Sequence, residues 1–320
     1  MANIRDIAKA AKVSISTVSR VLNNYPHITQ EKREAVLQAM QQLNYYQNIN
    51  AVHLSKGKTM MVGVLCPFIN HSYYAPLLEG IIEQSHSLGY KLMVIQTYYQ
   101  DEKEVGALEA LKHKQIDSLI VLSRKLTLDK YEEYLPYGII VMCEKIKHKA
   151  FQSLFIDQYA AFQTAYNFLV TKGHKDIAYC TGREMGTSSE LRKKAYIDGL
   201  KNSGMSLKKE WIFPNSFFLE DGKLLMRKLL ELKRIPSALI VTNDMVAAGI
   251  ILESKKIGIS IPDDLAIIGL DNDPIAEAME ITTISLPLKE MGRQAFKSSL
   301  IEDIAHPIKI PFELIKRKTV

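Results

Sequence analysis

The chain has 320 residues, 47% of them hydrophobic and 24% charged, which are values typical of globular proteins, and this length predicts more than one domain. No window approaches the roughly 18 uninterrupted apolar residues of a membrane helix, and charged residues at positions 5, 6 and 9 exclude an export signal, so a cytoplasmic location is expected. Of the net charge of +6, the first 58 residues carry +5, from eight basic and three acidic side chains, which is the asymmetry expected if only the N-terminal part meets a polyanion.

The first 45 residues predict three short helices. Residues 4–11 repeat apolar side chains at helical spacing behind a possible N-cap, Asn3, and a second helix follows Ser14 and runs to about residue 22. The three residues between these helices are typical of a helix-turn-helix. A third helix is expected after Thr29, and it would close a small core with Val36, Met40 and Leu43.

The second helix has a polar face that carries Ser16, Ser19 and Arg20. This face could simply be a solvated helix surface. It also lies inside the basic segment, and an arginine can bind guanine O6 and N7 with two hydrogen bonds, while serines suit phosphates and base edges. The pattern therefore favours a DNA-reading helix.

The run from residue 4 to residue 23, IRDIAKAAKVSISTVSRVLN, resembles the opening of the LacI/GalR family of bacterial repressors, as does LNY at residues 43–45. The resemblance implies that Ile15, Ser16 and Arg20 read the bases of double-stranded, pseudo-palindromic operator DNA. It also implies a set of phosphate-binding residues. These are Asn3, Ser14, Thr17, Ser19, Asn24 and His27.

Residues 48–55 match the hinge helix of that family. The match includes Ala51 and Leu54, and it implies that Leu54 enters the minor groove as a wedge, which bends the duplex. The alternative is that Leu54 is an ordinary linker residue. Two departures affect these DNA contacts: Gln47 and Val52 stand where the family has proline and a polar or basic residue.

A third departure lies in the turn between the first two helices, where Lys12 replaces the family's glycine or asparagine. A left-handed conformation costs a non-glycine residue about 1 to 2 kcal/mol. The turn is therefore expected to differ slightly from that of the family.

From residue 59 onward, apolar runs alternate with helical patterns, which indicates buried parallel strands joined by crossover helices. The first series has strand-like runs at 60–66, 91–95, 116–122 and 138–142, with helical stretches up to residue 86 and at 102–112. The second has strands at 177–180, 238–242 and 265–270, with helices at 159–172, 191–203, 245–256 and up to residue 231. The fold class predicted is α/β, with two doubly wound lobes behind a three-helix head.

The resemblance also covers the body, for example in TNDMVAAG at 242–249 and IPDDL at 261–265. It implies a two-lobed body like a periplasmic sugar-binding protein, with three crossings of the chain between lobes. The expected domains are a head of residues 1–46, a hinge of 47–58, a first lobe of 59–157 with 287–320, and a second lobe of 158–286.

Ligands of such sheets lie beyond the carboxyl ends of the strands. The residues that follow strands or the crossover include Tyr73, Tyr74, Asp157, Asn243 and Asp271, and family position adds Arg192 and Phe217 as effector-binding residues. Rings that cover an apolar sugar face and side chains that bind vicinal hydroxyls suit a sugar. The alternatives are also open: Asn243 and Asp271 could be helix N-caps, the tyrosines could pack the lobe, and Arg192 could pair with Glu190.

The sequence has no GxSxG, P-loop, HExxH or GxGxxG motif, so neither an enzyme nor a cofactor is expected. Three cysteines without CxxC spacing predict reduced core residues and no metal site. The prediction is a homodimeric regulator, most simply a repressor, that binds operator DNA and a small effector such as a sugar. Two alternatives stay open: a catabolite regulator controlled by a phosphorylated carrier protein, although no arginine pair is apparent at 294–301, and a sugar-binding protein without a regulatory role.

Overall fold

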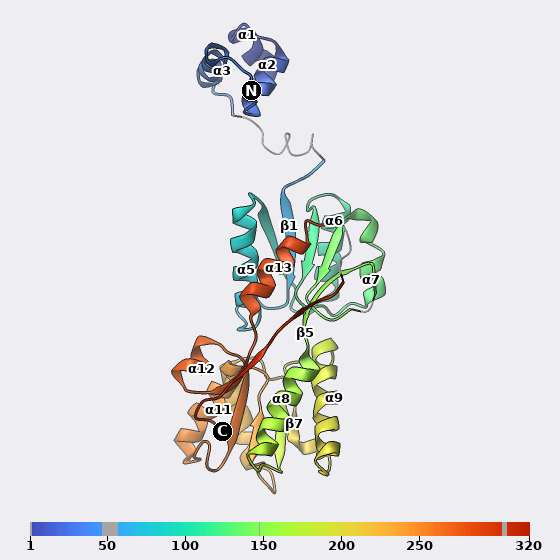
Figure 1. Cartoon of the computed structure of the whole chain (residues 1–320), viewed down its shortest axis with the longest axis vertical. Helices are drawn as coiled ribbons and strands as arrows, with labels where there is room; N and C mark the ends of the chain where they lie inside the picture. The colour runs from blue at the N-terminus through green and yellow to red at the C-terminus, as the bar shows by residue number, and fades with distance from the viewer. Residues whose placement is uncertain (1, 47–56, 147, 303–305) are drawn as a thin grey trace. The chain divides into compact units, whose positions relative to one another are not determined.

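The fold is that of a computed structural model, which describes residues 2–46, 57–146, 148–302 and 306–320. The chain divides into two compact units, a head of Met1–Thr59 and a body of Met60–Val320 (Figure 1). The hinge residues Ala51 and Leu54 lie outside the described residues. In the described ranges, no helix is long and apolar enough to cross a bilayer.

The head has three helices, and side chains cap the first two. They are α1 (Ile4–Ala10), α2 (Ile15–Leu22) and α3 (Gln30–Gln42). Asn3 and Asp6 form a capping box on α1, and the Ser14 hydroxyl accepts the backbone N–H of Thr17 at the start of α2. Lys12 adopts a φ of +53°, so the turn takes the left-handed conformation even though the residue is a lysine.

The core of the head is small. Only some of the side chains predicted to pack into it from the third helix are buried. Ile7, Val18 and Val36 have no exposed surface. Leu43, in contrast, is 37% exposed, and Ala39 contributes to the core. The reason is that α3 ends at residue 42, so Leu43 no longer follows the helical face that carries Val36.

The body consists of two six-stranded sheets with the same winding. The strand order is β11-β5-β4-β3-β1-β2 in the first lobe and β12-β10-β9-β8-β6-β7 in the second. All neighbours are parallel except β12, which runs antiparallel to β10. The strands of the first sheet are β1 (Met61–Cys66), β2 (Lys91–Gln96), β3 (Ser118–Val121), β4 (Ile139–Met142), β5 (Gln152–Ile156) and β11 (Ile308–Ile310). Those of the second are β6 (Ile177–Cys180), β7 (Ile212–Phe213), β8 (Ala238–Ile240), β9 (Ala266–Asp271), β10 (Thr282–Ser285) and β12 (Glu313–Ile315).

Helices cover both sheets, because the central strands are apolar on both faces (Figure 1). The helices that pack on the first lobe are α5 (Tyr74–Ser87), α6 (Asp101–Lys112), α7 (Leu128–Glu132) and α13 (Leu288–Ser298), with a short 3-10 turn at Leu135–Tyr137. Those of the second are α8 (Gln158–Thr171), α9 (Thr187–Asn202), α10 (Leu219–Leu230), α11 (Asp244–Ile257) and α12 (Pro274–Ala278), with a 3-10 turn at Lys209–Trp211.

Each lobe has one pair of helices whose backbones touch at glycines. In the α5–α13 pair, a Cβ at Gly292 would lie 2.1 Å from the carbonyl oxygen of Leu77. In the α10–α11 pair, a Cβ at Gly249 would lie 2.0 Å from the carbonyl oxygen of Leu219. Only glycine fits at these crossings.

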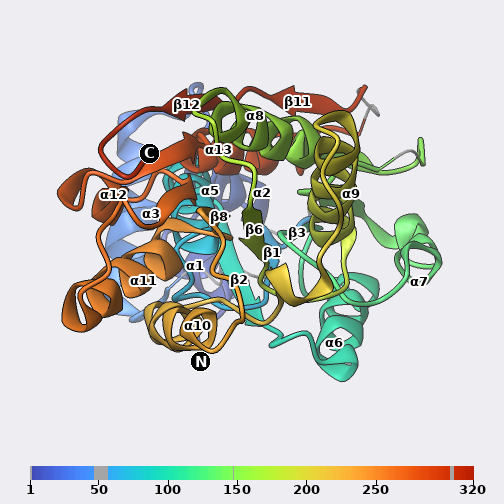
Figure 2. The ribbon, with the colours of Figure 1, turned by 90° about the horizontal axis from the view of Figure 1, so that it is seen from below.

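The chain passes between the lobes three times: after β5, after β10, and between β11 and β12. The last passage corrects the predicted placement of all of 287–320 in the first lobe. Strand β12 pairs with β10 of the second sheet and lies beside α8 (Figure 2), and the backbone carbonyl of Thr319 accepts the N–H of Ile267 at 2.7 Å. The final strand belongs to the second lobe because it pairs the otherwise open backbone edge of β10.

Candidate functional site

The head presents an exposed polar face on α2. Ser16 and Arg20 are exposed, and Ile15 is 46% exposed although it is apolar. The Arg20 guanidinium has no hydrogen-bond or ion-pair partner among the described residues. Hydroxyls at the start of the helix are linked, since the Ser14 Oγ lies 2.7 Å from that of Ser16 and 2.9 Å from Oγ1 of Thr17. An unpaired arginine can contact guanine, and an exposed aliphatic residue of the same helix can contact a thymine methyl group.

The residues predicted to hold phosphates have mixed surroundings. His27 is exposed, whereas Ser19 is half-buried. Asn3 already serves as the cap of α1, and the Asn24 Oδ1 accepts a hydrogen bond from Arg33 Nη1 at 3.2 Å. Arg33 also donates to the Tyr25 carbonyl at 3.1 Å, so it fixes the loop after α2.

A cleft lies at the carboxyl ends of strands from both sheets, with about 780 Å³ of space that atoms do not fill, part of which is open solvent. Five of the seven predicted effector residues line it, namely Tyr73, Tyr74, Arg192, Phe217 and Asp271. The sequence reasoning did not single out several further lining residues, which include Tyr99, Ser123, Glu144, Gln158, Arg183 and the loop 186–189.

The first lobe contributes aromatic side chains to the cleft. The Tyr74 hydroxyl lies 2.8 Å from that of Tyr99, which lies 3.2 Å from Ser123 Oγ. Tyr73 packs edge-on against Tyr74, with 5.2 Å between ring centroids. Burial raises the pKa of both Tyr73 and Tyr74, so these hydroxyls stay protonated and can donate hydrogen bonds.

Arg192 enters the cleft from α9 and is buried, with 8% of its surface exposed. Its Nε donates to Gln158 Oε1 at 2.9 Å, and its Nη1 donates to the carbonyl oxygen of Thr242 at 3.3 Å. Among the described residues, Nη2 has no partner and no carboxylate forms an ion pair with this guanidinium. The alternative of a surface pair with Glu190 is therefore wrong.

Asp271 ends strand β9 in the cleft and is 5% exposed. Neither of its carboxylate oxygens has a hydrogen-bond partner among the described residues. Burial and the charges of Asp273 and Asp244 raise its pKa well above the ordinary range, against the opposing effect of Arg192. The backbone of Asp271 also has a φ of +103°, which is a strained conformation for any residue other than glycine.

A cluster of rings joins the lobes at one edge of the cleft. Phe217 of the second lobe packs against Phe68 of the first, with 5.7 Å between centroids, and His71 lies 5.7 Å from Phe218. Burial, and then the positive charge of Arg192, lowers the pKa of His71 to about 4, so its ring is neutral.

Two predicted effector residues do not line the cleft. Asn243 caps α11, since its Oδ1 accepts the N–H of Val246 at 2.8 Å, and its Nδ2 lies 3.3 Å from His71 Nε2. Asp157 caps α8 and pairs with Lys309 at 2.9 Å. The N-cap interpretation of Asn243 agrees with this geometry, whereas Asp271 caps no helix, because Asp273 is the residue before α12.

Most of the lining residues that the sequence did not reveal lie in loops that follow strands, and they belong to no sequence motif. Each of the first three, Tyr99, Ser123 and Glu144, stands two or three positions after the end of β2, β3 or β4. Arg183 lies in the loop after β6, and Gln158 begins α8. A search of every strand end for polar or aromatic residues could have found them.

Two family models match parts of the chain. Residues 3–48 match the lacI family of bacterial regulatory proteins, and residues 166–320 match the periplasmic binding protein-like domain. An uncharacterized helix-turn-helix transcriptional regulator of Bacillus subtilis strain 168 is 41% identical over 323 residues, with all of both chains covered. The NTD biosynthesis operon regulator of the same organism is 37% identical, again over all of both chains.

The fold is also that of a solved repressor. The lac repressor dimer bound to operator and an anti-inducer superposes with a TM-score of 0.86 at 22% identity, covering 99% of this chain and 98% of that one. At this identity the likeness concerns the fold alone.

Proposed function

Because the chain belongs to the lacI family of bacterial regulatory proteins, we propose that it is a cytoplasmic repressor controlled by a small effector. Membership of this family makes it a DNA-binding transcriptional regulator rather than an enzyme. The proposed effector is most simply a sugar or sugar derivative, and it binds in the cleft. Family membership removes the alternative of a sugar-binding protein without a regulatory role. We further propose a homodimer that binds a pseudo-palindromic operator, as the solved lac repressor dimer is bound to its operator.

One observation carries the effector proposal: the unpartnered carboxyl of Asp271. A buried polar group without a partner costs about 1–3 kcal/mol, and here both oxygens lack one among the described residues. The cost disappears if hydroxyls of a ligand donate to Asp271 and a ligand oxygen accepts from the free Nη2 of Arg192. Tyr73 and Phe217 would then cover the apolar face of a sugar ring.

The proposed control is a shift between two arrangements of the lobes. The chain crosses between them at three places, so a ligand that contacts both sides stabilises one arrangement. In a homodimer, the two heads must reach half-sites about one helical turn apart, and a change in their separation changes DNA affinity.

A screen of neutral sugars by thermal shift tests the effector site. A true ligand should raise the Tm of the full chain, and Asp271→Asn should weaken that ligand by about tenfold to a hundredfold. Asp129→Asn, an exposed acidic residue on α7, is the matched control and should bind as the parent does. Equal binding by the Asp271 variant and the parent would show that Asp271 is not an effector residue.

The DNA site is tested by selection from a random duplex library, followed by binding measurements on the selected sequence. Arg20→Ala should cost about 1–3 kcal/mol on the selected duplex and relax its base preference. Arg5→Ala removes the same charge from α1, and it should weaken binding to all duplexes alike. If Arg20→Ala changed selected and random duplexes equally, Arg20 would not read bases.

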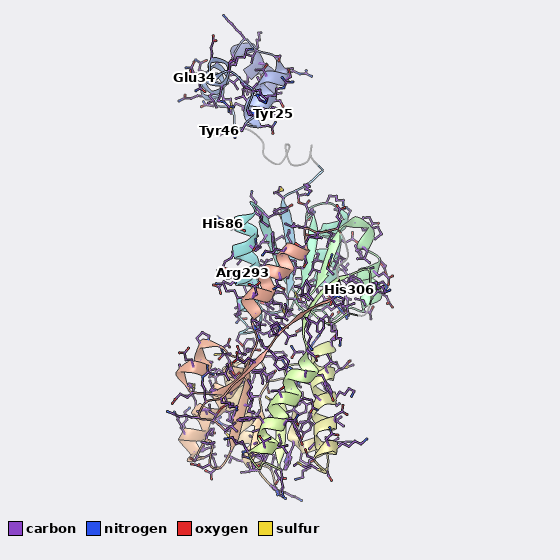
Figure 3. All side chains as sticks on the ribbon, viewed as in Figure 1. Tyr25, Glu34, Tyr46, His86, Arg293 and His306 are labelled. Carbon is purple, nitrogen blue, oxygen red and sulfur yellow. The ribbon has the colours of Figure 1, made fainter. Side chains whose placement is uncertain are left out.

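The remaining alternative is control by a phosphorylated carrier protein, which would need free positive charge on α13. Lys289 and Arg293 of that helix instead pair with acidic residues of α5 (Arg293 is labelled in Figure 3). Lys289 lies 2.6 Å from both Glu79 and Glu83, and Arg293 lies 2.8 Å from Glu83. These two cations are already neutralised, and Lys297 is the one cation of α13 without an ion-pair partner among the described residues. A single free charge is a poor receptor for a phosphorylated protein, so this surface favours the small effector.

A further inference from the structure

The cleft of the second lobe has a positively charged end that the proposed function does not yet use. We propose that the effector carries a phosphate-type dianion, held at the start of α9 by the loop 182–189 and the guanidinium of Arg183. The inference rests on the proposed function, since it assigns a chemical class to the ligand of the same cleft.

The first observation is an uncapped helix start that faces the cleft. Helix α9 is 16 residues long, and its N-cap, Gly186, has no side chain to accept a hydrogen bond. The backbone N–H groups of Thr187, Ser188 and Ser189 have no acceptor among the described residues, and all three residues line the cleft. Free N–H groups at the positive end of a helix dipole bind an anion well.

The second observation is that Arg183 lies beside these N–H groups without an acidic partner. A Cβ at Gly186 would lie 2.4 Å from Arg183 Nη2, so the guanidinium rests directly against the glycine. It stacks 4.2 Å above the ring of Tyr99 from the first lobe, and the Ser189 hydroxyl donates to the Arg183 carbonyl at 2.8 Å. These contacts fix the guanidinium and leave its charge unpaired among the described residues.

The third observation is Arg192, a second guanidinium that is more than nine-tenths buried in the same cleft. Its hydrogen-bond partners, Gln158 and Thr242, are neutral, and Nη2 is free among the described residues. Of the two acids that line the cleft, Glu144 already pairs with Arg124, and burial raises the pKa of Asp271 well above the ordinary range, which favours its neutral form. A neutral ligand would leave a buried positive charge uncompensated, whereas a dianion would supply the missing partner through charge-assisted hydrogen bonds.

The positions of these groups also predict a ligand with two chemically different parts. A phosphate group at the 186–189 end would leave the carboxyl of Asp271, whose oxygens have no partner among the described residues, for the hydroxyl groups of the ligand. A phosphorylated polyol has both parts. Free inorganic phosphate shares the anionic chemistry but lacks the hydroxyl-bearing part, so binding measurements distinguish these two sources.

The test uses the full chain and four kinds of probe at constant ionic strength: inorganic phosphate, chloride, hexoses such as glucose and fructose, and their 6-phosphates. Inorganic phosphate at millimolar concentration should raise the Tm, and chloride should not. Arg183→Gln should weaken phosphate by about tenfold to a hundredfold in calorimetry, and Arg183→Lys should restore part of the loss. Lys193→Gln removes an equal charge from the exposed face of α9 and should have no effect.

The outcomes separate the two proposals. If phosphate acted as chloride does, or bound Arg183→Gln as it binds the parent, the anion site would be wrong. If a neutral sugar bound in an Asp271-dependent way while its phosphate did not, the anion site would fail and the effector cleft would stand. An Arg183-dependent response that no hexose phosphate strengthens would identify inorganic phosphate as the occupant.

Discussion

The two lobes of the body share a winding pattern but contribute different chemistry to the cleft between them. In both, the first five strands follow the same order, and one helix pair crosses at glycines. The first lobe contributes mainly rings, and its one lining acid, Glu144, is neutralised by Arg124. The second contributes Arg183, Arg192 and Asp271, none of which forms an ion pair with another described residue.

The comparison teaches that the scaffold and the site are specified separately. The scaffold depends on apolar strands and on close helix crossings, which both lobes have. The site depends on the few residues that follow each strand, where the sheet leaves side chains free to differ. Substitutions in the scaffold should therefore have similar effects in both lobes. Substitutions at the strand ends should have different effects in the two lobes.

The largest effect is expected from the shared scaffold. Gly249→Ala and Gly292→Ala place a methyl group against a backbone carbonyl, and each should lower the free energy of unfolding by at least about 3 kcal/mol in denaturant titrations. Gly106→Ala, in α6, meets no atom within 4 Å and should stabilise the protein by about 0.5–1 kcal/mol. If only one of the two substitutions lowered the free energy of unfolding, the close helix crossing would stabilise only one of the lobes.

The second lobe should lose stability as pH rises. Burial raises the pKa of Asp244 from 3.8 to about 7, so the folded protein holds a proton that the unfolded chain has released above pH 4. Asp244 should therefore contribute a fall in the free energy of unfolding on the order of 2–3 kcal/mol between pH 4 and pH 7. Asp244→Asn should remove this contribution in urea titrations, while Asp271 and Asp273, whose pKa values are also raised, keep theirs. Parallel curves for parent and variant would contradict the assignment.

The first lobe should respond to acid with the opposite sign. Since burial lowers the pKa of His71 from 6.5 to about 4, the unfolded chain binds a proton that the folded ring rejects. His71 should therefore contribute a loss of stability on the order of 2 kcal/mol as pH falls from 6.5 to 4, which opposes the contribution of Asp244. His71→Gln should remove this loss while leaving the Asp244 slope in place, which thermal unfolding across the same pH range can resolve.

The smallest effect concerns the tyrosine chain of the first lobe. Tyr74→Phe removes the hydrogen bond to the Tyr99 hydroxyl, which measures 2.8 Å, and should lower the free energy of unfolding by about 0.5–1.5 kcal/mol. The change should weaken effector binding less than Asp271→Asn does, because the Tyr74 hydroxyl is neutral and its loss leaves no charged group without a partner. An effect larger than that of Asp271→Asn would assign ligand recognition to the first lobe.

Much of the fold was predictable because its signals are local. Helical spacing and the caps Asn3 and Ser14 define the first two helices, and apolar runs mark the long central strands. The strand ends also indicated Tyr73 and Asp271 as lining residues before any geometry was known. The short strands β7, β11 and β12 have too few residues for a periodic pattern to distinguish them from loops.

The sequence by itself determined the three-helix head, the alternation of strands and helices, and which residues end the strands. Only the tertiary structure decided which of those ends face the cleft: Asp157 pairs instead with Lys309, 152 positions away in the chain, whereas Arg183 stacks on Tyr99 of the other lobe. It also decided that the last strand returns to the second lobe. The physical reason is that periodicity and capping act between neighbours in the chain, while ion pairs, ring contacts and strand edges are satisfied between segments that meet only after folding.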